Sequence, residues 1–263
     1  MTATIINFTS IPPRMAKLQR VVDALQAQTA KIDGIILWIP RSYRRSDFQG
    51  YTIPTLPKGI EVRYSDKDYG PATKILPATL AFQGQDVRLI YCDDDEVYRP
   101  EWAATLIEGS EAHPEACVTI SGLNVASVDF EMHLRRNRQT LLNRASFGAY
   151  SRLYARRHRP ARPKLGQVDI CQGFGGVLVR PHFFGPEVYD IPDVLWTVDD
   201  IWLSGHLAMR GVPIHRVSPR KLCSKSELAR VHDLTSYNYN NDDRISADHK
   251  CVEYYRREYA VWA

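Results

Sequence analysis

The sequence lacks the features of a secreted or membrane-spanning chain. Its amino terminus has no basic segment followed by a long apolar stretch, and no run of about 18 consecutive apolar residues occurs anywhere. The five cysteines form no CxxC pair and no zinc-like spacing. We therefore expect a cytoplasmic protein with reduced thiols and no structural zinc.

Internal repeats and segments of low complexity are also missing, so nothing in the sequence marks a linker. At 263 residues, with 44% hydrophobic and 10% aromatic residues, the chain is long enough to build a full core. We expect a single domain that spans residues 1–263.

Acidic residues are absent from the segment 135–164, which contains ten Lys or Arg residues. The net charge is +4, and the other 24 basic residues face 30 acidic ones, so this segment carries the basic character. Phe147, Tyr150 and Tyr154 are interleaved with the basic side chains. The segment suits nucleic acid, an anionic membrane surface or a phosphate-bearing acceptor, and a solvated loop is the alternative.

What is present is an alternation of apolar strands and helical patterns. Residues 3–8 and 34–39 are predicted strands, and the apolar spacing between residues 15 and 25 predicts a helix. This is a βαβ unit, which requires a parallel pair of strands. Further strands are predicted at 60–64 and 87–92. The fold class is therefore α/β, with a mostly parallel central sheet flanked by helices.

Four consecutive carboxylates, Asp93 to Glu96, follow the strand at 87–92 directly. Ligands of open α/β sheets bind beyond the carboxyl ends of the strands. Because side chains alternate in an extended chain, Asp93 and Asp95 are expected on one side and Asp94 on the other. Paired carboxylates suit Mg²⁺ or Mn²⁺, which keep their other positions for water and phosphate. An acidic surface turn is the alternative.

Three later features also point to a site. Gly173, Gly175 and Gly176 lie between two apolar patches, where they allow the backbone to approach a ligand or simply form a bulge. Asp199 and Asp200 open a predicted helix, a place where the helix dipole alone would favour acids. His232 follows, with a structural histidine as its alternative interpretation.

In this order, the carboxylates, the glycine loop, the acidic pair and the histidine resemble those of a GT-A fold glycosyltransferase with an aspartate-any-aspartate motif. The resemblance extends from the first strand to about residue 235. It implies a Rossmann-like sheet with an acceptor-side insertion and transfer of a sugar from a nucleotide-sugar donor. It also implies a nucleotide-binding half at about 1–97, an acceptor-binding half at about 98–235 and a C-terminal tail at about 236–263.

The same resemblance implies roles for individual residues. Asp95, Asp93 and His232 would bind the metal. The donor site would include Thr9, Ser10, Lys74, Asp93, Asp94, Gly175 and Gly176. Trp196 and Gly173 would contact the acceptor, Asp200 would act as general base, and Asp199 would position hydroxyl groups. The acidic pair in the family is usually Glu-Asp, and the Asp-Asp found here leaves open which carboxylate is the base. Capping by Thr9 and Ser10 and a solvent-facing Lys74 stay as alternatives.

The expected cofactor is Mn²⁺ or Mg²⁺, and the expected donor carries UDP. The expected acceptor is a hydroxyl of a glycan or lipid-linked molecule, such as a bacterial surface polysaccharide or lipopolysaccharide. Segment 135–164 would contact the inner face of an anionic membrane, and no nucleic-acid partner is expected. The alternatives are a sugar-phosphate nucleotidyltransferase, although residues 9–13 lack its glycine-rich loop, and a non-catalytic nucleotide- or polyanion-binding protein.

Overall fold

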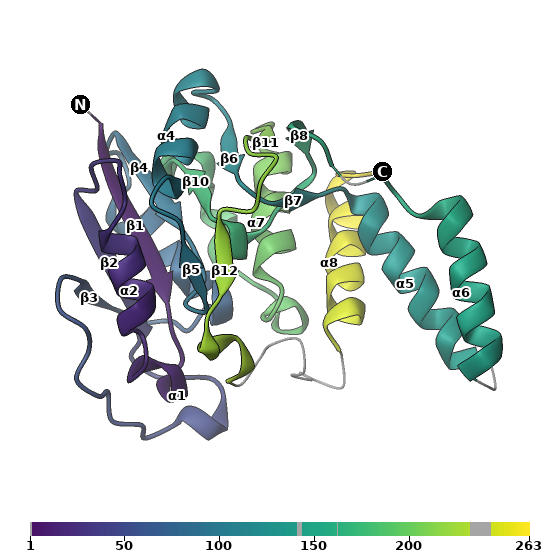
Figure 1. Cartoon of the computed structure of the whole chain (residues 1–263), viewed down its shortest axis with the longest axis horizontal. Helices are drawn as coiled ribbons and strands as arrows, with labels where there is room; N and C mark the ends of the chain where they lie inside the picture. The colour runs from purple at the N-terminus through teal and green to yellow at the C-terminus, as the bar shows by residue number, and fades with distance from the viewer. Residues whose placement is uncertain (1, 141–143, 162, 232–242) are drawn as a thin grey trace.

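The computed structural model describes residues 2–140, 144–161, 163–231 and 243–263. Its centre is a sheet of eight strands in the order β3-β2-β1-β4-β10-β6-β11-β8 (Figure 1). These strands are β1 (Ala3–Thr9), β2 (Gly34–Pro40), β3 (Glu61–Ser65), β4 (Val87–Tyr91), β6 (Cys117–Thr119), β8 (Gly166–Val168), β10 (Val177–Val179) and β11 (Ile214–Arg216). Four neighbouring pairs are parallel and three are antiparallel. The predicted α/β class with a mostly parallel sheet flanked by helices is confirmed.

Helices cover both faces of the sheet. Helices α2 (Gln19–Gln26) and α4 (Trp102–Ala112) belong to one apolar layer, and α3 (Leu76–Ala81), α7 (Asp199–Met209) and α8 (Arg244–Tyr259) to the other. The short helix α1 (Pro12–Met15) follows β1. Small two-stranded sheets pair β5 (Glu96–Tyr98) with β12 (Cys223–Lys225), and β7 (Gly122–Leu123) with β9 (Ile170–Cys171).

The first four strands fix the position of the site. β3, β2, β1 and β4 are mutually parallel neighbours, so their carboxyl ends meet at one edge of the sheet. Thr9 ends β1 there, and Asp93 follows two residues after the end of β4. The crossover from β1 to β2 runs through α2, as the apolar spacing predicts.

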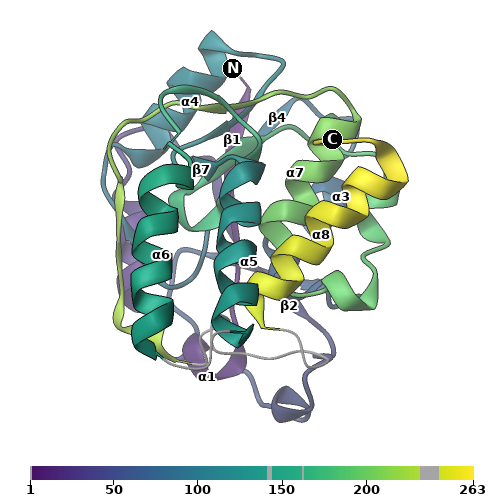
Figure 2. The same ribbon diagram turned by 90° about the vertical axis from the view of Figure 1, so that its right-hand side faces the viewer.

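Most of the basic segment is helical. It overlaps α5 (Val125–Thr140) and α6 (Arg144–His158), two helices that lie side by side at one end of the molecule (Figure 2). The two helices lie outside the central sheet, as an insertion would, whereas the alternative of a solvated loop does not agree with their helical structure. The apolar residues are few because one face of each helix is exposed, which weakens the sequence signal.

The region expected as a C-terminal tail contains α8, which packs into the core. Cys251, Val252 and Tyr255 are fully buried, and the Tyr255 hydroxyl donates to the Trp202 carbonyl at 2.8 Å. Asp243 caps the helix by accepting from the Ser246 amide. No helix in the described ranges is long and apolar enough to span a bilayer.

Candidate functional site

A cavity of about 530 Å³ opens at the carboxyl edge of the parallel strands. Its acidic lining residues are Asp68, Asp93, Asp94, Asp95, Glu96, Asp199, Asp200 and Asp248. Its basic lining residues are Arg14, Arg45, Lys74, Lys221, Lys225 and Arg244. Both acidic motifs, which are more than 100 residues apart in the sequence, therefore face the same cavity.

Lys74 joins these two motifs. Its Nζ lies 2.5 Å from Asp93 Oδ1 and 2.7 Å from Asp199 Oδ2, and its side chain is 4% exposed. Burial alone would lower the pKa of Lys74, but Asp199 and Asp93 raise that pKa well above its usual value. Lys74 is thus a charged, buried link, and the solvent-facing alternative is excluded.

Asp94 is turned into the protein. It accepts hydrogen bonds from Ser10 Oγ at 2.5 Å and from Arg14 Nη1 at 2.6 Å. Burial raises the pKa of the Asp94 carboxyl, although Arg14 and Ser10 act in the opposite direction. The contacts of Asp94 are with protein groups, and Arg14 is a cavity residue that sequence analysis missed. The available signal was a basic residue in the short helix that follows the first strand.

Asp93 and Asp95 retain access to the cavity, with side chains 32% and 23% exposed. Burial, with the negative charges of Asp93 and Asp94, raises the pKa of Asp95 to about 7. Eight acidic and six basic residues line the cavity, so acidic side chains outnumber basic ones. Two accessible carboxylates leave room for water and phosphate oxygens on such an ion. The described residues therefore fit Mn²⁺ or Mg²⁺, whereas His232 lies outside the described residues.

The acidic pair opens α7, as predicted, and its two members differ in environment. Burial would raise the pKa of Asp199, but Lys74 and Arg244 overcome this effect and lower it. Burial and the neighbouring Asp199 raise the pKa of Asp200 well above its usual value. Asp200 Oδ1 accepts a hydrogen bond from the Gly173 amide at 2.9 Å, and the side chain of Asp200 is 16% exposed. Asp199 is therefore an ion-paired structural anion, and Asp200 is the carboxylate able to take up a proton.

The glycine loop is needed for close packing within the protein. A Cβ at Gly173 would lie 2.3 Å from Lys74 Nζ. Gly176 has φ +91°, and a Cβ there would lie 2.3 Å from Trp102 Nε1. Gly175 accepts from the same indole at 2.7 Å. The loop thus approaches protein groups closely, and it orients Asp200 through the Gly173 amide.

Three other expected residues line the cavity through elements distant in sequence. Thr9 Oγ1 donates to the Trp38 carbonyl at 2.8 Å, and Ser10 contacts Asp94 as described. Trp196 is 5% exposed, and its Nε1 donates to the Asp68 carbonyl at 3.1 Å. Both hydroxyl groups therefore already donate a hydrogen bond to a protein acceptor, and Trp196 has little exposed surface.

Helix α8 supplies cavity residues that sequence analysis missed. Arg244 Nε donates to Asp248 Oδ1 at 3.1 Å, and Arg244 Nη2 lies 4.0 Å from Asp200 Oδ2. Burial would lower the pKa of Arg244, but the negative charges of Asp248, Asp199 and Asp200 outweigh this effect and raise it. Arg244 and Asp248 are four residues apart in the sequence, a spacing that places an oppositely charged pair on one face of a helix.

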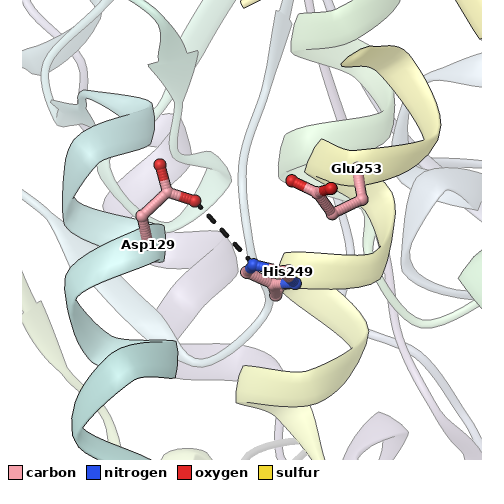
Figure 3. Close-up of side chains that lie close together, drawn as sticks. All are labelled: Asp129, His249 and Glu253. Carbon is pink, nitrogen blue, oxygen red and sulfur yellow. Dashed lines mark ion pairs between the residues drawn. The ribbon is translucent and has the colours of Figure 1, made fainter. Parts of the chain in front are cut away.

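A second cluster of potential metal ligands lies between α5 and α8. The ligand atoms of Asp129, His249 and Glu253 lie within 4.8 Å of one another (Figure 3). Arg256 already donates to both oxygens of Asp129, at 3.0 and 2.8 Å, and to Glu253 at 2.8 Å. The guanidinium group supplies the positive charge that these carboxylates need. This cluster therefore fastens α8 to α5 without a metal ion.

Comparisons with known proteins identify no close relative. No protein-family model matches the sequence, and no curated protein matches it. Among solved structures, the chain is similar to the mannosyltransferase PcManGT from Pyrobaculum calidifontis in complex with GDP-Man and Mn²⁺, with 13% identity and a TM-score of 0.43. The similarity covers 84% of this chain and 55% of that chain, so this chain spans about half the neighbour's length. A likeness this distant does not identify the activity. Any assignment of activity therefore has to rest on the residues that line the cavity.

Proposed function

We propose that the protein is a metal-dependent glycosyltransferase that moves a sugar from a nucleotide-sugar donor to a hydroxyl group. The observation that carries this proposal is the shared cavity, in which Lys74 joins the turn at Asp93 to the acidic pair at Asp199. One half of the cavity suits a metal-bound diphosphate, and the other half holds a candidate base. A sugar transferase needs both functions next to each other.

Asp93 and Asp95 would hold the metal ion. An ion bound there would stabilise the negative charge that develops on the diphosphate as the glycosidic bond breaks. Lys74 keeps Asp93 in place and adds a fixed positive charge next to the leaving group. The nucleoside would bind next to Thr9 and Ser10, which line the cavity at the end of β1, and UDP is the nucleotide that we expect.

Asp200 would act as the general base. An acceptor hydroxyl must lose its proton as it attacks, and a carboxylate of raised pKa is a stronger base than an ordinary one. The Gly173 amide fixes one oxygen of Asp200, while Lys74 keeps Asp199 ionised. A base on the protein favours an inverting reaction.

Residues 98–235 would contribute most of the acceptor side, including Gly173 and Trp196, and residues 1–97 most of the donor side. The acceptor would be a glycan or lipid-linked molecule, and the basic segment 135–164 would bring the protein to an anionic membrane that carries it. Arg244 and Asp248 extend the acceptor side onto α8.

Metal affinity is expected to rise with pH through about pH 7. Protons compete with the metal for Asp95, whose pKa is about 7 in the folded protein. Above this pH the carboxylate is ionised and available, and below it the affinity should fall by up to about tenfold per pH unit. Calorimetric titration with Mn²⁺ on either side of pH 7 measures the effect. An affinity independent of pH would show that Asp95 is not a ligand.

Calorimetric titration with UDP, GDP and CDP, with and without Mn²⁺, tests the proposed function. Binding of one nucleotide only when the metal is present supports it. No binding of any nucleotide to the folded protein would refute it.

A further inference from the structure

The outward face of α6 is basic and contains an exposed leucine. Arg152, Arg156 and Arg159 recur at helical spacing and are exposed, Arg159 lying one residue beyond the end of α6, and Arg157 is exposed beside them. Leu153 lies within this group with 55% of its surface exposed. We define these five residues as the α6 outer face. No acidic residue occurs in the surrounding segment 135–164 to neutralise it.

Tyr150 and Tyr154 of the same segment face the other way, into the contact between α5 and α6. The ring of Tyr154 stacks on His133 and Phe130 of α5, with centroids 4.1 and 5.7 Å apart. Along α6 it also stacks on Tyr150 and His158, at 5.7 and 4.5 Å. Nucleic-acid bases bind by stacking on exposed aromatic faces. Because these rings stack on one another, the α6 outer face does not fit single-stranded nucleic acid.

We propose that the α6 outer face docks the protein on an anionic membrane. Arginine side chains gain free energy from the negative potential of an anionic lipid surface. A leucine among them can enter the boundary between headgroups and acyl chains, where its apolar surface leaves water. The combination of four arginines with one exposed leucine fits a lipid surface better than a purely polar polyanion.

Two sets of ion pairs connect α5, on which α6 packs, to α8. Arg135 Nε of α5 lies 2.6 Å from Asp243, the N-cap of α8, and Arg256 of α8 holds Asp129 of α5. Arg244, directly after that N-cap, lines the cavity. Figure 2 shows α6, α5 and α8 side by side. Docking through α6 would therefore hold the acceptor side of the cavity near the bilayer, where a lipid-linked hydroxyl is available. This consequence for the acceptor rests on the proposed function, whereas docking itself does not.

Flotation of the full chain with vesicles tests the proposal without nucleotide or metal. We expect binding to vesicles of equal parts phosphatidylglycerol and phosphatidylcholine, and much weaker binding to phosphatidylcholine alone. The triple variant Arg152→Glu, Arg156→Glu and Arg157→Glu should bind at least about 100-fold more weakly. The control variant Arg20→Glu, Arg99→Glu and Arg257→Glu changes the net charge equally at exposed positions on other elements and should bind like the wild type.

Leu153→Ser separates a membrane from other polyanions. We expect about tenfold weaker vesicle binding, because the leucine no longer enters the bilayer. The proposal is overturned if both triple variants bind vesicles equally, if Leu153→Ser has no effect, or if the wild type binds an RNA oligonucleotide but not anionic vesicles. Because no nucleotide is present, a failed donor-binding experiment would leave this result unaffected. Circular dichroism confirms that each variant is folded.

Discussion

Replacing Asp200 with asparagine is expected to reduce sugar transfer by about 100- to 10,000-fold while nucleotide binding stays near the wild-type value. Asparagine has the same shape and can still accept the Gly173 amide, so the loop should keep its position. It cannot take the proton of the acceptor hydroxyl. The loss should therefore appear in the rate of transfer and not in the affinity for the donor.

The pH dependence of the same variant provides a second readout. Because the pKa of Asp200 is raised, the wild-type rate should increase with pH as this carboxyl loses its proton. This increase of the rate with pH should be absent from the residual activity of Asp200→Asn. Asp190→Asn is the matched control, since Asp190 is 88% exposed and is not among the lining residues of the cavity. If Asp200→Asn transferred sugar at the wild-type rate, Asp200 would not be the base.

Lys74→Met is expected to lower the free energy of unfolding by about 3–5 kcal/mol. The lysine side chain is 4% exposed and lies between Asp93 and Asp199, of which Asp199 is equally buried. Removing the cation leaves a buried carboxylate without its partner, and the desolvation of that charge is no longer compensated. Urea denaturation measures the change.

Two further variants show whether the ion pair is the cause. Lys74→Met combined with Asp199→Asn should recover part of the loss, because the uncompensated charge is then removed as well. Lys67→Met removes a half-exposed lysine near the exposed Asp190, and we expect a change below about 1 kcal/mol. Equal stability of Lys74→Met and the wild type would show that Lys74 does not stabilise the two aspartates.

The sequence predicts well those features that depend on local patterns. The strands predicted at residues 3–8 and 87–92 are confirmed to within one residue, because each is a short apolar run with a clear end. Asp93 and Asp199 could be identified as site candidates because each lies at the end of a predicted element. Their common cavity follows from the parallel sheet, which the βαβ pattern predicts.

Features that depend on long-range pairing could not be predicted in the same way. Nothing near Lys74 in the sequence indicates that it lies between two carboxylates, 19 and 125 residues further along the chain. Helix α8 was missed because its apolar residues are few among charged ones, and its burial depends on packing against α7. The glycine loop was expected to let the backbone approach a ligand or to form a bulge. In the structure, the side chain of Lys74 lies where a Cβ of residue 173 would be, and that of Trp102 lies where a Cβ of residue 176 would be.

The most direct test of the proposed site is calorimetric nucleotide binding with and without Mn²⁺, by the wild type, Asp95→Ala and Asp129→Asn. Asp129→Asn is the control because Asp129 belongs to the second acidic cluster, which Arg256 neutralises. We expect metal-dependent binding of one nucleotide by the wild type and Asp129→Asn, and its loss in Asp95→Ala. Binding that survives in folded Asp95→Ala but is lost in Asp129→Asn would contradict the placement of the metal site. Absence of binding in all three folded proteins would contradict the assignment of the cavity to a nucleotide-sugar donor.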